Sequence, residues 1–127
     1  MKLPIHIATA LALASCATVP PAEAGPTAAL GQMAETNGIR VQPLELLEDS
    51  RCPADVQCVW AGRVRLLAKI ELRGGSEELR TTLTLGEPLH VADGALTLVA
   101  VAPPKTKAGA RVDPRSYRFT FDFQGGL

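Results

Sequence analysis

The sequence is poor in the side chains that most catalytic and metal sites use. Its 127 residues include two histidines, and one of these, His6, falls within the first ten residues. A structural zinc site takes four Cys or His ligands, and an enzyme needs a nucleophile with a base or a pair of carboxylates. His90 and Asp93 form only an H-x-x-D spacing. We therefore expect no catalytic residue, no metal and no cofactor, and we keep a metal-binding protein that uses His90 as an alternative.

An excess of charge of one sign is also absent. Thirteen Lys and Arg residues balance 13 Asp and Glu residues. Because nucleic acid requires a basic patch on its partner, this balance argues against nucleic acid as a ligand. The sequence also contains no glycine-rich loop of the kind that binds phosphate.

No apolar run reaches the roughly 20 residues that a membrane-spanning helix needs. The mostly apolar run at residues 3–14 follows Lys2 and ends at small residues. A short apolar run between a basic start and small residues is typical of a signal peptide, which we place at residues 1–15.

The stretch LASC at residues 13–16 resembles the lipobox of bacterial lipoproteins. The resemblance implies that Cys16 receives lipid, becomes the new N-terminus and anchors the protein in a membrane of the cell envelope. By the same analogy, Ala17 in place of Asp favours the outer membrane. The alternative is cleavage after Ala24, which yields a secreted or periplasmic protein.

Residues 16–30 are rich in Ala, Pro and Gly, a composition that predicts a flexible tether behind the lipid. Alternatively, residues 28–30 already join the first strand. Residues 31–127 are long enough for one domain with one hydrophobic core.

Beyond the tether, apolar residues recur with a period of two. Residues 64–72 and 117–123 alternate apolar with polar or charged side chains, which predicts two strands with one buried face each. In a weaker strand at residues 39–47 the apolar phase shifts at Pro43, which predicts a bulge or an edge position. Further weak strands are predicted at residues 79–85, 89–91 and 96–102.

Dipeptides suited to tight hairpin turns lie between these segments. They are Asn37-Gly38, Gly74-Gly75 and Asp93-Gly94. No long segment has a helical period. Six or seven short antiparallel strands in about 100 residues predict an all-β fold, a small Ig-like β-sandwich, with a small β-barrel as the alternative.

Cys52 and Cys58 are the pair that remains once Cys16 carries lipid. Thiols oxidise in the cell envelope, so we predict a disulfide that closes a small loop. A zinc site has too few ligands, and the C-x-x-C spacing of redox sites is absent. At strand spacing, Trp60 would share a face with Cys58 and pack against the disulfide.

The same region carries a resemblance to a group of proteins. The pattern D-S-R-C-P-x-x-V-x-C-x-W-x-G at residues 49–62 is similar to a motif of small, largely uncharacterised bacterial lipoproteins and secreted proteins. The later segments LTLGEP and SYRFTF are similar to that group as well. The resemblance supports the architecture and implies no established activity.

Two loops form the candidate contact surface: the disulfide loop and the segment at residues 103–115, in which Lys and Arg outnumber Asp. We expect a lipid-anchored envelope protein that acts as a non-enzymatic binding or structural module, with an envelope protein, a glycan or anionic lipid as its partner. The alternative is a secreted or periplasmic inhibitor that presents the Cys52–Cys58 loop. The candidate contact residues are Asp55, Val56, Gln57, Trp60, Lys105, Lys107, Arg111 and Arg115.

Overall fold

The computed structural model describes residues 25–105 and 111–125. The predicted signal peptide, the predicted lipidation site Cys16 and the candidate contact residue Lys107 lie outside the described residues.

The described chain forms eight strands and two single turns of 3-10 helix. The strands are β1 (Thr27–Ala28), β2 (Ala34–Thr36), β3 (Ile39–Asp49), β4 (Val64–Leu72), β5 (Glu77–Thr84), β6 (Leu89–Val91), β7 (Gly94–Ala102) and β8 (Arg118–Gly125), and the helical turns are η1 (Arg73–Gly75) and η2 (Pro114–Ser116). The six predicted strands correspond to β3 through β8. The structure adds β1 and β2, which are too short, at two and three residues, to carry a two-residue period.

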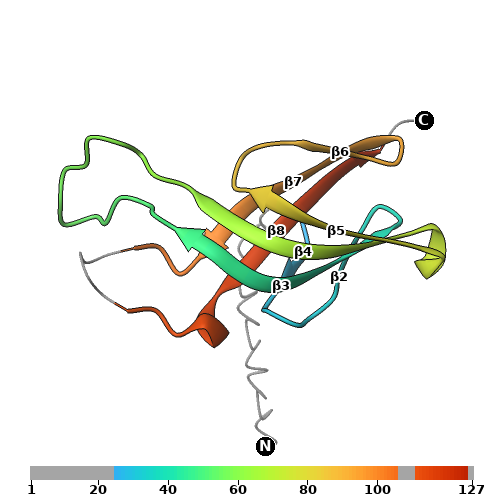
Figure 1. Ribbon diagram of the computed structural model, residues 1–127, viewed down its shortest axis with the longest axis horizontal. Helices are drawn as coiled ribbons and strands as arrows, with labels where there is room; N and C mark the ends of the chain where they lie inside the picture. The colour runs from blue at the N-terminus through green and yellow to red at the C-terminus, as the bar shows by residue number, and fades with distance from the viewer. Residues whose placement is uncertain (1–24, 106–110, 126–127) are drawn as a thin grey trace, which may run out of the picture.

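The strands build two antiparallel sheets, in the orders β1-β8-β7-β6 and β2-β3-β4-β5. Figure 1 shows the two layers stacked, with β3, β4 and β5 in front of β7 and β8. Neither sheet closes on itself, so the predicted β-sandwich is confirmed and the barrel is not found. The fold resembles an Ig domain only in its two-layer architecture, because the four consecutive strands β2 to β5 form one sheet here.

The core lies between the sheets, and the two-residue period explains it. Every second side chain of β4 and of β8 points inward and is buried. The inward set of these two strands is Val64, Leu66, Ala68, Ile70, Phe119, Phe121 and Phe123. Each buried Phe contributes about 1.5–3 kcal/mol, so β8 is a main source of stability.

The phase shift at Pro43 is a bulge. The register between β3 and β4 slips between Pro43 and Glu45, and again between Leu46 and Glu48. Pro43 also lies at a local edge, since β2 pairs only with Ile39–Val41 and the rest of β3 pairs with β4 alone.

Two of the predicted turns are confirmed and one is displaced by a residue. Asn37-Gly38 and Gly74-Gly75 have the positive φ that tight turns need. In the third turn Ala92 takes the positive φ, and Gly94 already starts β7. Gly94 lies so close to β8 that a Cβ would stand 2.2 Å from the Gln124 carbonyl oxygen, which is why glycine falls in the strand and not in the turn.

The domain begins earlier than residue 31. Thr27 and Ala28 pair with Thr120 and Phe119 of β8, so the end of the predicted tether belongs to the sheet. Of residues 28–30, which were the alternative start of the first strand, only Ala28 lies in a strand, the separate strand β1. Within the residues described, no helix is long and apolar enough to cross a membrane.

Candidate binding surface

Two long connections meet at one end of the sandwich, which we call the loop end. They are the β3–β4 connection at residues 50–63 and the β7–β8 connection at residues 103–117. Figure 1 shows both at the same end of the molecule, on the left of the view. The Ala54 amide donates to the Lys105 carbonyl oxygen at 3.0 Å, so the two loops are in direct contact.

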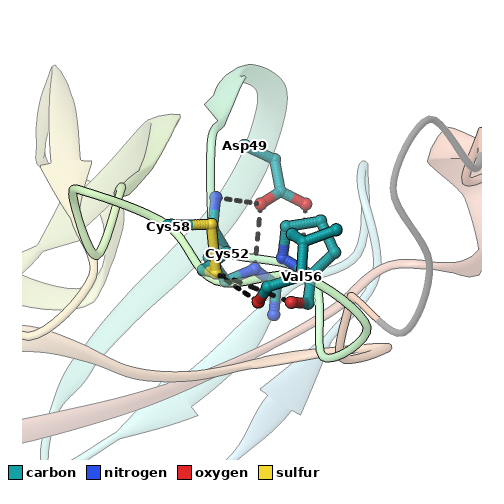
Figure 2. Close-up of a disulfide and its surroundings, with 6 residues drawn as sticks. Asp49, Cys52, Val56 and Cys58 are labelled. Carbon is teal, nitrogen blue, oxygen red and sulfur yellow. Dashed lines mark hydrogen bonds and ion pairs between the residues drawn. A yellow bond between two sulfur atoms is a disulfide. The ribbon is translucent and has the colours of Figure 1, made fainter.

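The predicted disulfide is confirmed. Cys52 and Cys58 are bonded, with their Cα atoms 5.8 Å apart, and the bond encloses residues 53–57 (Figure 2). Within this small ring, the backbone carbonyl oxygen of Val56 lies 3.5 Å from the Cys52 sulfur (Figure 2). The ring therefore has a fixed shape that five residues without a cross-link would not keep.

Below the disulfide, the two ends of the loop are tied together. The Ser50 amide donates to the Arg63 carbonyl oxygen at 2.8 Å, and the Arg63 amide donates to the Ser50 hydroxyl oxygen at 2.9 Å. Gly62 makes this approach possible, since its φ is +70° and a Cβ would lie 1.8 Å from the Ser50 carbonyl oxygen. Glu48 and Arg63 add an exposed ion pair at 2.7 Å. We call this clasp, together with the disulfide, the loop base.

A buried carboxylate joins the loop base to both sheets. Asp49 ends β3 in register with the buried Val64, so its side chain points toward the core and is 6% exposed. Its two oxygens accept from the Arg51 guanidinium, each at 2.9 Å. The hydroxyl of Tyr117, the residue that precedes β8 of the other sheet, donates to the same carboxylate at 2.7 Å.

The charges of this cluster fix its protonation. Burial alone would raise the pKa of Asp49, but the hydrogen bonds from Arg51 and Tyr117 and the Arg51 charge outweigh burial and lower it to about 2. Burial and the neighbouring carboxylate raise the pKa of Tyr117 to about 12. The hydrogen bond to Asp49 raises the pKa of Arg51 above its ordinary value. Asp49 therefore stays ionised and Tyr117 stays neutral over the whole physiological range.

The same cluster also holds the second loop. Arg51 donates to the carbonyl oxygens of Val101 and Pro103 at 3.0 and 2.9 Å, and the Lys105 ammonium donates to the Asp49 carbonyl oxygen at 2.6 Å. Lys105 was predicted as a contact residue, but its ammonium is engaged in this internal bond. The sequence analysis missed the cluster, because the Asp-x-Arg spacing of Asp49 and Arg51 does not reveal that both meet Tyr117.

The prediction that Trp60 packs against the disulfide is wrong. Trp60 is 82% exposed and the preceding Val59 is 90% exposed. The prediction assumed strand spacing after Cys58, but residues 59–63 form no strand and reverse at Gly62. Val59 and Trp60 therefore project beyond the loop base, and we call these two residues, with the exposed Val56, the loop tip.

The other candidate contact residues lie at the same end where the structure describes them. Asp55 and Gln57 are exposed within the disulfide ring, and Arg111 and Arg115 are exposed on the second loop. The fold thus brings the two predicted contact segments onto one surface.

The remaining chemistry lies away from this surface and is sparse. His90 is exposed on β6, and the described residues contain no group of three or more His, Cys, Asp or Glu side chains that could hold a metal ion. At the opposite end of the sandwich, which we call the turn end, one shallow cleft is lined by Asn37, Leu72, Asp93 and Phe123 among others. A second, more polar cleft there is lined by Glu35, Arg40 and Glu71 with glycines of the β4–β5 turn.

Comparisons with known proteins give no relative. No family model matches the chain, and neither a curated protein nor a solved structure matches it. The resemblance to small bacterial lipoproteins stays a prediction, and function has to be argued from the surface itself.

Proposed function

We propose that this protein is a lipid-anchored, non-enzymatic binding module of the bacterial envelope that contacts its partner through the loop tip. One observation carries the proposal: Val59 and Trp60 are almost fully exposed on a loop whose base is fixed by a disulfide and a buried ion pair. Exposed apolar side chains that cluster mark interaction sites, and Trp is among the residues that contribute most to binding.

The fixed base supports this function energetically. A loop that is already ordered loses little conformational entropy when it binds, so more of the contact energy appears as affinity. The clasp between Ser50 and Arg63 and the disulfide supply that order before any partner arrives.

The anchor rests on the N-terminal sequence. A signal peptide at residues 1–15, a lipidated Cys16 and the short segment before the first paired strand at Thr27 would hold the domain close to a membrane surface. A native mass spectrum of the protein from its membrane fraction tests this. A diacylated chain that begins at Cys16 is expected, and a chain that begins at Gly25 would contradict the anchor.

A second candidate is an inhibitor of a periplasmic or secreted enzyme. The stiff ring that presents Asp55, Val56 and Gln57 favours it, because a rigid convex loop can fill the cleft of an enzyme.

Photo-crosslinking in intact cells tests the role of the loop tip. A photoreactive residue in place of Val59 should give a specific adduct, whereas the same residue in place of Leu79, which is 41% exposed on β5, should give none. Equal labelling from both positions would contradict a dedicated contact surface. Replacement of Asp55 and Gln57 separates the inhibitor, since these two ring residues lie outside the loop tip and only the inhibitor function requires them.

A further inference from the structure

We infer that the partner of the loop tip is the anionic bilayer surface to which the chain is tethered, with Val59 and Trp60 inserted at the level of the lipid headgroups. This inference deepens the proposed function and rests on it, because it names the class of partner that the exposed tip contacts.

The shape of the loop end is the first argument. The two clefts described above lie at the turn end, and no residue of the 50–63 loop lines either of them. The 50–63 loop instead projects outward past the ends of β3 and β4 (Figure 1), and Val59 and Trp60 form an exposed apolar point on it. A fluid interface closes around such a point without needing a matching pocket, and Trp prefers the headgroup level of a bilayer because its ring is apolar and its N–H is polar.

The charges of the second loop are the second argument. The second loop, which contacts the first through Ala54 and Lys105, carries Arg111 and Arg115 as exposed cations. Its described part holds one acidic residue, Asp113, whose carboxylate is 3.6 Å from Arg115. Basic residues near an anionic bilayer add to its attraction, so the cations complement phosphatidylglycerol or cardiolipin headgroups.

The turn end has no excess of positive charge. Glu71, Glu77 and Glu78 lie there, at the end of β4 and the start of β5, and each is paired with an arginine, Arg40, Arg73 or Arg80. At the loop end, residues 48–63 and 103–117 contain six Lys and Arg residues against four Asp and Glu residues. An anionic surface therefore attracts the loop end more strongly than the turn end, which favours an orientation with the loop tip toward the lipid.

The length of the segment before the domain permits this orientation. Gly25 lies against Phe121, four residues from Tyr117, so at strand spacing it is about 13 Å from the base of the loop end. Eight residues separate Cys16 from Gly25, and an extended chain of that length reaches about 25 Å. A segment of this length can therefore reach past the base of the loop end, on the side toward which the 50–63 loop projects.

Fluorescence of Trp60 tests the inference directly, because it is the only tryptophan in the chain. The lipidated protein is reconstituted into vesicles of phosphatidylcholine with and without phosphatidylglycerol. With phosphatidylglycerol, we expect the emission to shift to shorter wavelength, iodide quenching to fall, and lipids brominated in the acyl chain to quench the signal. Equal emission and equal iodide quenching in both vesicles would overturn the inference and leave the tip to a protein partner.

Matched variants separate insertion from mere proximity. Val59→Asp should abolish the shift, whereas Leu79→Asp on the exposed part of β5 should leave it intact. In a Cys16→Ser chain, which has no lipid to hold it on the vesicle, Arg111→Ala and Arg115→Ala should each weaken vesicle binding about fivefold, whereas Arg80→Ala on β5 should not. Loss of binding in the β5 variants to the same extent would overturn the assignment to the loop end.

The anchor and the tip can fail separately. A Cys16→Ser chain receives no lipid, and its Trp60 emission should still shift when phosphatidylglycerol vesicles are added at low salt. If the wild-type protein carries no lipid but this shift occurs, the anchor fails and the inference stands. If the protein is lipidated and Trp60 stays in water, the anchor stands and the inference fails.

Discussion

The two ends of the sandwich connect their strands in different ways. At the turn end, neighbouring strands are joined by tight turns such as Asn37-Gly38 and Gly74-Gly75. The positive φ angles of these residues let the chain reverse its direction within a few positions. At the loop end, two long connections are held by a disulfide, a buried ion pair and hydrogen bonds that cross from one sheet to the other. The loop end therefore carries an ordered surface that is larger than the connection of the strands alone requires.

Removal of the buried charge should give the largest loss of stability. Asp49→Asn leaves the largely buried Arg51 guanidinium without its carboxylate and should cost about 3 kcal/mol of the free energy of unfolding. Urea denaturation measures this. The matched change at the turn end, Glu78→Gln, affects an exposed side chain and should cost less than about 0.5 kcal/mol. Equal losses would remove the difference between the two ends.

Loss of the disulfide should have the next largest effect. Cys52→Ser with Cys58→Ser releases a small ring, for which the chain-entropy model gives about 2 kcal/mol. Urea denaturation under oxidising conditions measures the loss, and the anisotropy of Trp60 should fall in the folded variant because the tip is no longer held. An unchanged anisotropy would mean that the clasp between Ser50 and Arg63 alone orders the loop.

The bond between the two sheets should contribute somewhat less. Tyr117→Phe keeps the ring, which stacks on Phe119, and removes only the hydrogen bond to Asp49. A hydrogen bond to a charged group is worth about 1.5 kcal/mol or slightly more. A thermal melt detects the change, and a loss as large as that of Asp49→Asn would contradict a minor role for the hydroxyl.

The dependence of stability on pH should identify the same cluster. The pKa of Asp49 is lower in the fold, about 2 against 3.8, so its contribution is complete above pH 3.8 and is lost as the pH falls toward 2. The pKa of Tyr117 is higher in the fold, about 12 against 10.0, so its contribution is complete below pH 10 and is lost as the pH rises through 12. Compared with the wild-type protein, the midpoint of thermal unfolding should depend less on pH at low pH in Asp49→Asn, and less on pH at high pH in Tyr117→Phe.

The smallest effect on stability is expected at the loop tip. Trp60→Ser removes a side chain that contacts little of the protein, so the free energy of unfolding should change by less than about 0.5 kcal/mol. In a Cys16→Ser chain, which carries no lipid, the same substitution should nevertheless abolish binding to phosphatidylglycerol vesicles, as sedimentation with the vesicles would show. A large loss of stability would mean that Trp60 packs in solution and that the tip is not an exposed surface.

The sequence analysis predicted the sandwich well because strands carry a signal in their own period. Residues 64–72 and 117–123 alternate, and the structure buries the expected faces. The disulfide was predicted because Cys52 and Cys58 are the two cysteines that remain once Cys16 is assigned to lipid. The loops carry no such period, so strand spacing was wrongly extended past Cys58 to Trp60. The cluster of Asp49, Arg51 and Tyr117 depends on a contact between residues 68 positions apart, which a single sequence does not show.

The separation of the loop base from the loop tip has a consequence for how this protein can change. Stability resides in the base, where Asp49, Gly62 and the two cysteines each have a defined structural task. The tip is attached to that base and contributes little to the fold. Mutations at residues 53–57 and 59–60 can therefore accumulate without unfolding the domain, so the same framework can be refitted for a new target by natural selection or by laboratory display of randomised loops.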